Sequence, residues 1–203
     1  MALARGRFED LAWVTGWDVA FADLYLDALT LHRASPDAVA GPWRLAFGAA
    51  PGLPPEAHVL LGMNAHINYD LPQSLIAVIP SEDFASPSLL DRRRRDHERI
   101  DDVLASRIAE EDVALQRVGG RRTPLDRLLA PVNRRASRAF LRESRRKVWA
   151  NTYALHAARL EGPAAYAVRV SDLEAASAER VADLLRPGPV LVRLAVHGFG
   201  VTL

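Results

Sequence analysis

The chain of 203 residues contains no cysteine. This absence excludes disulfides, iron–sulfur clusters and thiolate zinc sites, because each of them needs cysteine sulfur. Histidine, aspartate and glutamate remain as the strong side-chain ligands for a metal ion. Any metal site in this protein therefore depends on its six histidines and its 25 acidic residues.

Long apolar runs are also absent, since no stretch of about 18 uncharged apolar residues occurs. The amino terminus, Met1 to Asp10, carries arginines without the apolar stretch of a signal peptide behind them. The formal net charge is only +1, which gives little attraction to nucleic acid. The sequence therefore predicts a cytoplasmic protein that binds neither a membrane nor nucleic acid.

Apolar residues recur every three or four positions along most of the chain, which is the spacing of amphipathic helices. Pro72 is expected to end or kink one helix, and residues 71–79 to continue it. The tail 190–203 fits a helix or a short strand, and a helix is favoured. Without a linker or an internal repeat, residues 1–203 are predicted to form a single compact all-α bundle of about five to seven helices. The expected helices cover 17–31, a short segment around 43–47, 55–70, 88–115, 123–160 and 172–185.

The segment 58–70 carries the most informative pattern in the sequence. His58, Gly62, His66 and Asp70 follow one another at intervals of four and share one helix face. At this spacing His66 and Asp70 can bind one metal ion, or the carboxylate can hold the imidazole in a fixed tautomer. Glycine within a helix costs about 1 kcal/mol relative to alanine. We expect Gly62 to leave open space between His58 and His66.

A second histidine–aspartate pair, His97 and Asp101, lies in the next long helix with the same spacing. Two facing helices of a bundle can supply four ligands in this way. The predicted metal ligands are therefore His58, His66, Asp70, His97 and Asp101, with Asp18 and His156 as extra candidates. The alternatives are a chance pairing, a surface or capping role for His58, and a solvated helix face around His97, which follows Arg92 to Arg95.

The segment Leu60 to Pro72, with the sequence LLGMNAHINYDLP, resembles a largely actinobacterial family of uncharacterised function. The resemblance extends over most of the chain and implies no activity. His66 to Gln73 is also locally similar to the His-x-x-x-Asp segment of zinc-dependent phospholipase C and the related single-strand nucleases. That resemblance implies metal ligation by His66 and Asp70 alone. Met1 begins the chain in place of the metal-binding tryptophan of those enzymes, so a full three-zinc cluster is not expected.

Arginines also recur at helical spacing, and they could bind phosphate or form a salt-bridged face. The near-neutral net charge favours the salt-bridged face. Trp149 and Tyr153, four residues apart, are expected in the core. The arginines concerned are Arg92 to Arg95 in one helix and Arg134, Arg138, Arg142, Arg145 and Arg146 in another.

These patterns lead to three hypotheses about function. The first is an enzyme whose pocket contains His66 and Asp70, using bound zinc, iron or manganese to hydrolyse a phosphoester or related bond in a small molecule. The second is a metal-independent cyclase or lyase in which His66 is the acid/base for a small hydrophobic metabolite. The third is a non-catalytic helical module that binds a protein or a small ligand.

Overall fold

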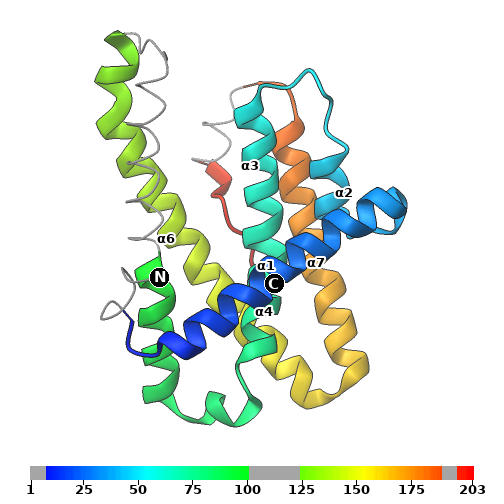
Figure 1. Ribbon diagram of the computed structural model, residues 1–203, viewed down its shortest axis with the longest axis vertical. Helices are drawn as coiled ribbons and strands as arrows, with labels where there is room; N and C mark the ends of the chain where they lie inside the picture. The colour runs from blue at the N-terminus through cyan, green and yellow to red at the C-terminus, as the bar shows by residue number, and fades with distance from the viewer. Residues whose placement is uncertain (1–7, 101–123, 189–195) are drawn as a thin grey trace.

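A computed structural model describes residues 8–100, 124–188 and 196–203 (Figure 1). This part of the chain is helical and contains no strand, which confirms the all-α prediction. Its elements are α1 (Leu11–Ala34), α2 (Gly41–Phe47), α3 (Pro55–Ala65), the π-helical turn η3 (His66–Asp70), α4 (Leu71–Val78), a helix over 87–100, α6 (Pro124–Glu161) and α7 (Pro163–Leu185), with short 3-10 turns at Pro36–Ala38 and Ser81–Ala85. No described helix is long and apolar enough to cross a membrane.

Two helices begin earlier than their apolar patterns predicted. The first, α1, begins at Leu11 because the Asp10 carboxylate accepts the Trp13 N–H at 3.0 Å, which is an N-cap bond. The last, α7, begins at Pro163, since proline is well tolerated in a first helical turn. Gly162 separates α6 from α7 with a φ of 128°, a conformation that favours glycine.

Pro72 does not end the helix but follows a widened turn. The N–H of Leu71 reaches back to the carbonyl of His66, five residues earlier, so the turn over His66–Asp70 is a π-helix. Because proline has no N–H to donate and its ring crowds the preceding turn, the extra residue relieves the conflict. The segments α3, η3 and α4 thereby form one continuous element through the middle of the protein.

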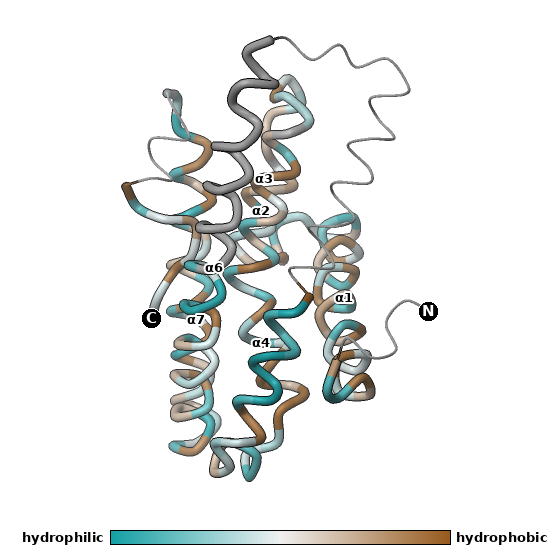
Figure 2. The backbone as a smooth tube through the Cα atoms, turned by 90° about the vertical axis from the view of Figure 1, so that its left-hand side faces the viewer, coloured by the Kyte–Doolittle hydropathy of each residue, from teal (hydrophilic) through white to brown (hydrophobic). Residues whose placement is uncertain are grey.

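This central element is enclosed by the other helices. α4 packs between α1 on one side and α6 on the other (Figures 1 and 2). α7 packs along α2, α3 and α6. The π-turn η3 contacts α1, α6 and α7, so it lies where several helices meet.

Aromatic rings from α1 stack on one another in a buried apolar cluster that also contains Leu75 and Val148. Trp13, Trp17 and Phe21 are spaced four residues apart, and successive rings are nearly parallel with centroids 6.1 and 5.9 Å apart. The Arg93 guanidinium lies 4.9 Å from the centre of the Trp13 ring. The other end of the stack, Phe21, faces His66 in the π-turn.

The helix over 87–100 is tied to the start of α1 by a buried carboxylate. Asp96 accepts the backbone N–H groups of Glu9 and Asp10, each at 2.8 Å. Arg95 and Arg99 pair with Glu9 and together hold the pKa of its carboxyl down at about 2. These pairs agree with the salt-bridged face expected for the arginines of this helix, while the side chains of Arg134, Arg138 and Arg142 lie outside the described residues.

His97 is fully buried, so the alternative that placed this histidine on a solvated helix face is wrong. Its ring packs edge-on against Trp17 and Trp149, with centroids 4.9 and 5.8 Å away. The Nδ1 atom lies within hydrogen-bonding range of Trp149 Nε1 at 3.3 Å and of the Arg145 guanidinium at 3.2 Å. Burial, reinforced by Arg145 and Arg94, holds the pKa of His97 well below 6.5.

The chain end also differs from the favoured prediction. After a helical pair at residues 196–197, residues 198–203 form neither a helix nor a strand. Gly198, with a φ of 76°, makes the turn between the two parts.

The lowered pKa of His97 predicts a loss of stability in mild acid. The unfolded chain binds a proton near pH 6.5 that the folded chain excludes, so stability is complete above this pH and falls below it. At pH 5 the wild type should lose up to about 2 kcal/mol relative to His97→Gln. Urea unfolding at pH 7.5 and 5.0 measures this, with His58→Gln as a control that keeps the wild-type loss. Equal pH dependence in His97→Gln would contradict the assignment.

Candidate functional site

The π-turn places His66 and Asp70 in direct contact. Nδ1 of His66 lies 2.8 Å from Oδ2 of Asp70. The Asp70 side chain is only 3% exposed, whereas the His66 side chain is 23% exposed. The predicted contact between these two residues is therefore present, with a buried carboxylate behind a solvent-accessible imidazole.

Trp43 of α2 completes this arrangement. Its Nε1–H donates to the same Oδ2 atom of Asp70 at 2.9 Å. Because the ionised carboxylate only accepts hydrogen bonds, His66 carries a proton on Nδ1. In the neutral imidazole the lone pair is then on Nε2, for which the described residues supply no hydrogen-bond partner. His66 is thus held in the tautomer that makes Nε2 a base.

Burial is the main influence on the Asp70 carboxyl. It raises the pKa of Asp70 above 3.8, while the hydrogen bonds from His66 and Trp43 oppose that rise. A carboxylate in this position costs stability, because few polar groups replace the lost water. Titratable groups with pKa values perturbed by burial and a specific partner are common at functional sites.

Three aromatic rings surround the His66 imidazole. Phe21 lies flat against it, with ring centroids 3.6 Å apart and an interplanar angle of 7°. Tyr25 and Trp43 approach at an angle, with centroids 5.9 and 5.8 Å away. The Nδ1 hydrogen bond thus fixes the orientation of the imidazole within its own plane, and the stacked Phe21 ring prevents the imidazole from tilting out of that plane.

Gly62 leaves open space one helical turn before His66, as its spacing predicted. A Cβ atom added at Gly62 would meet only Trp43, at 4.0 Å. Tyr25, whose ring centroid lies 5.9 Å from that of the imidazole, is 37% exposed, and Met63, next to Gly62 in the chain, is 43% exposed. The partly exposed imidazole is therefore bordered by an aromatic ring that also reaches solvent.

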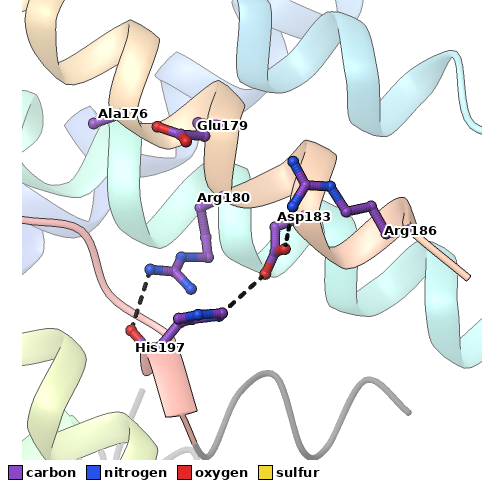
Figure 3. A pocket seen from close by; sticks show the side chains of 6 residues that line it. All are labelled: Ala176, Glu179, Arg180, Asp183, Arg186 and His197. Carbon is purple, nitrogen blue, oxygen red and sulfur yellow. Dashed lines mark hydrogen bonds and ion pairs between the residues drawn. The ribbon is translucent and has the colours of Figure 1, made fainter. Parts of the chain in front are cut away.

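A cavity of about 270 Å³ lies elsewhere, where α7 faces His197 (Figure 3). Within it Asp183 pairs with Arg186 at 3.2 Å, and Arg180 donates to the His197 carbonyl at 3.1 Å. Neither His66 nor Asp70 lines it. This cavity is therefore separate from the histidine–aspartate pair.

The other predicted ligands do not join His66 and Asp70. His58 lies two turns earlier in α3, and His97 packs on Trp17 rather than on the Phe21 ring that contacts His66. Asp18 is exposed on α1, and His156 stacks on Phe84 at 3.8 Å. Asp101 lies outside the described residues. Within the described ranges no three histidine or acidic side chains gather where they could hold a metal ion.

The hydrogen bond between His66 and Asp70 also decides how the two could serve a metal. Asp70 occupies the Nδ1 side of the ring, and Nε2 points away from it. An ion on Nε2 therefore cannot share Asp70 as a ligand in this arrangement. Asp70 would instead orient the histidine from behind, as carboxylates often do for metal-bound histidines.

The aromatic partners of the site are not predicted by the sequence patterns. Phe21 and Tyr25 belong to the apolar stripe of α1, and a spacing of four from Trp13 and Trp17 could have grouped them. Trp43 gave no comparable signal, because its contact with Asp70 spans 27 positions and two helices.

Asp70→Asn is expected to stabilise the protein increasingly as the pH rises. Because the pKa of Asp70 is raised on folding, its ionisation costs free energy that is absent below pH 3.8 and grows above it. An asparagine Oδ1 in place of Oδ2 can still accept from His66 and Trp43. Urea unfolding of variant and wild type between pH 3.5 and 7 measures the difference. Asp18→Asn, at an exposed site on α1, is the control; a difference independent of pH at Asp70 contradicts the prediction.

Gly62→Ala is expected to raise the free energy of unfolding by about 0.5–1 kcal/mol, because alanine favours the helix and its Cβ meets no atom closer than 4.0 Å. Gly16→Ala in α1 is the matched control, since a Cβ there has nothing within 4 Å. Thermal and urea unfolding measure both variants. A destabilised Gly62→Ala would show that the opening is closed.

The chain matches one protein family, and no activity is known for that family. No curated protein and no solved structure matches the chain. The model of a family of unknown function, DUF5995, matches residues 1–187. This match includes His66, Asp70, Trp43 and the helices that hold them. The chain belongs to the DUF5995 family of unknown function.

Proposed function

We propose that this protein is an enzyme in which His66 is the general acid/base for a small, uncharged, largely apolar substrate. The observation that carries the proposal is the hydrogen-bond chain Trp43–Asp70–His66, which ends in an Nε2 that no described residue hydrogen-bonds. This choice takes the second of the three hypotheses drawn from the sequence.

The chemistry follows from the tautomer. Nε2 accepts a proton from the substrate, and the buried carboxylate stabilises the imidazolium that forms, as in other carboxylate–histidine pairs. The Phe21 ring lies parallel to the imidazole and keeps it from rotating. No reorganisation of the pair is then needed when the proton arrives.

The surroundings of His66 favour an uncharged substrate over a phosphoester. Among the described residues, the charged group that acts on the Asp70 carboxyl is His66 itself, and no arginine or lysine acts on it. A phosphoester needs positive charge to stabilise its transition state. The opening over Gly62 and the exposed Tyr25 and Met63 suit an apolar body. Proton abstraction that leads to ring closure or elimination is the reaction class we favour.

Turnover is expected to fall about 100-fold or more in His66→Gln, because general acid/base catalysis contributes roughly 10²–10⁴-fold. The measurement screens small apolar metabolites and chromogenic esters by mass spectrometry and absorbance, then compares variants on any compound converted. His58→Gln is the control, since this histidine lies two turns away on the same helix. Activity that survives in His66→Gln would refute the proposal, and saturable binding without turnover would favour the binding-module hypothesis.

Metal-assisted hydrolysis is the competing reading, with zinc, iron or manganese on Nε2. Metal content of the purified protein separates it from the metal-free proposal. Stoichiometric metal that is lost in both His66→Ala and Asp70→Ala would replace acid/base catalysis by metal-assisted hydrolysis. Turnover in the presence of a chelator, lost in His66→Gln, supports the metal-free site.

A further inference from the structure

The last residues of the chain lie between the α3–η3 segment and α6. The side chains of Phe199 and Val201 are 7% and 6% exposed and join two different core clusters. Thr202, between Val201 and Leu203, is exposed. The tail thus inserts alternate side chains, as an extended strand does.

Its backbone is bound by side-chain amides. Asn68 donates to the Phe199 carbonyl at 3.0 Å and accepts the Val201 N–H at 3.2 Å. Asn151 repeats the pattern two residues on, donating to the Val201 carbonyl and accepting the Leu203 N–H, both at 3.0 Å. Each amide therefore replaces the donor and acceptor pair that a neighbouring strand would offer.

Two charged residues of α6 bind the backbone between these amides. Glu143 accepts the N–H groups of Phe199 and Gly200 at 3.2 and 3.1 Å, and Lys147 donates to the Gly200 carbonyl at 3.0 Å. All of these contacts are with backbone atoms of the tail, so they do not discriminate between different tail side chains. The side-chain requirement is a small residue at Gly200, where an added Cβ would lie 3.0 Å from Ser144 Cα. We call Asn64, Asn68, Glu143, Lys147 and Asn151 the tail site.

The tail leaves the third amide incomplete. Asn64 is fully buried and donates to the Phe199 carbonyl at 3.1 Å, but its Oδ1 has no hydrogen-bond partner among the described residues. The backbone turns at Gly198, whose φ is 76°. A buried acceptor without a donor is unfavourable, and a strand that ran straight past Phe199 could supply the donor.

The family match covers the tail site but does not cover the residues that occupy it. Every residue of the tail site lies within the matched range 1–187, whereas residues 196–203 lie outside it. The binding residues thus belong to the family fold, and the segment that fills them here does not fall within the match.

From these observations we infer that the tail site binds an extended peptide segment of a partner protein, with an apolar–small–apolar pattern. The chain's own carboxyl terminus occupies the site as an intramolecular plug. The partner segment stays extended where this tail turns at Gly198. A backbone N–H on the amino-terminal side of its first apolar residue then donates to the Oδ1 of Asn64. This inference is independent of the catalytic proposal, and its test uses binding alone.

The test uses full-length Gly200→Val, in which the added Cβ would lie 2.9 Å from Lys147 Cδ and displace the tail. Two fluorescein-labelled peptides are the probes: residues 196–203, and the same peptide with Gly198→Val, which favours straight continuation. Anisotropy should show saturable binding of both, with the second peptide tighter. Asn151→Ala should weaken both about tenfold or more, since it leaves two backbone groups unpaired. Asn64→Ala should remove the advantage of the second peptide.

Thr202→Val is the matched control, because residue 202 is exposed and the docked tail should still exclude both peptides. Absence of saturable binding to folded Gly200→Val overturns the inference, as does equal affinity for the two peptides.

The wild type provides a measurement that does not depend on the variant folding. An amidated form of the second peptide, at millimolar concentration to match the effective concentration of the attached tail, should accelerate carboxypeptidase trimming of Leu203. Mass spectrometry follows the trimming. An unchanged rate contradicts displacement, and a wild-type dimer that exchanges tails would assign the site to a second copy instead.

Discussion

The extra residue in the turn before Pro72 is the constraint on which the arrangement depends. With a regular helix, proline would clash with the preceding turn; with the π-turn, the Leu71 N–H reaches His66 and the helix continues. π-turns of this kind are frequent at functional sites. Here the turn points His66 and Asp70 toward the aromatic rings of α1 and α2, and Asn68 toward α6 and the carboxyl terminus. One local conflict in the sequence thus places two sets of polar side chains on different sides of one helix.

Polar groups are buried at this turn and elsewhere in the protein, at a free-energy cost that apolar burial offsets. Asp70, Asn68 and His97 are each 2% exposed or less, and each depends on partners distant in sequence. The apolar clusters around Trp17, Trp43 and Leu155 provide the compensating burial. A buried polar network is favourable only when its members find partners, so the unpaired Oδ1 of Asn64 stands out against the paired amides of Asn68 and Asn151.

Local patterns predicted what depends on neighbours in the sequence. The spacing of His66 and Asp70 predicted their contact, Gly62 predicted the open space, and the apolar pattern ending at residue 160 predicted the end of α6, since each is a property of one helix. The burial of His97 could not be found this way, because four arginines precede it and its partners Trp17 and Trp149 come from other helices. The prediction for the carboxyl terminus was wrong for the same reason. The side-chain amides that hold it extended belong to α3, η3 and α6, which are distant in the sequence, so the tail's own residues could not indicate its conformation.

The two proposed sites are joined by the turn itself. Asn68, which binds the tail, lies between His66 and Asp70 in the five residues of η3. A segment that pulls on Asn68 therefore acts on the backbone that sets the distance from His66 Nδ1 to Asp70 Oδ2. Coupling between two sites is reciprocal in free energy, so a substrate that holds His66 in place favours one geometry of Asn68 in equal measure. On the two proposals, occupancy of the tail site and the alignment of the histidine are coupled through a turn that has one residue more than an α-helix needs.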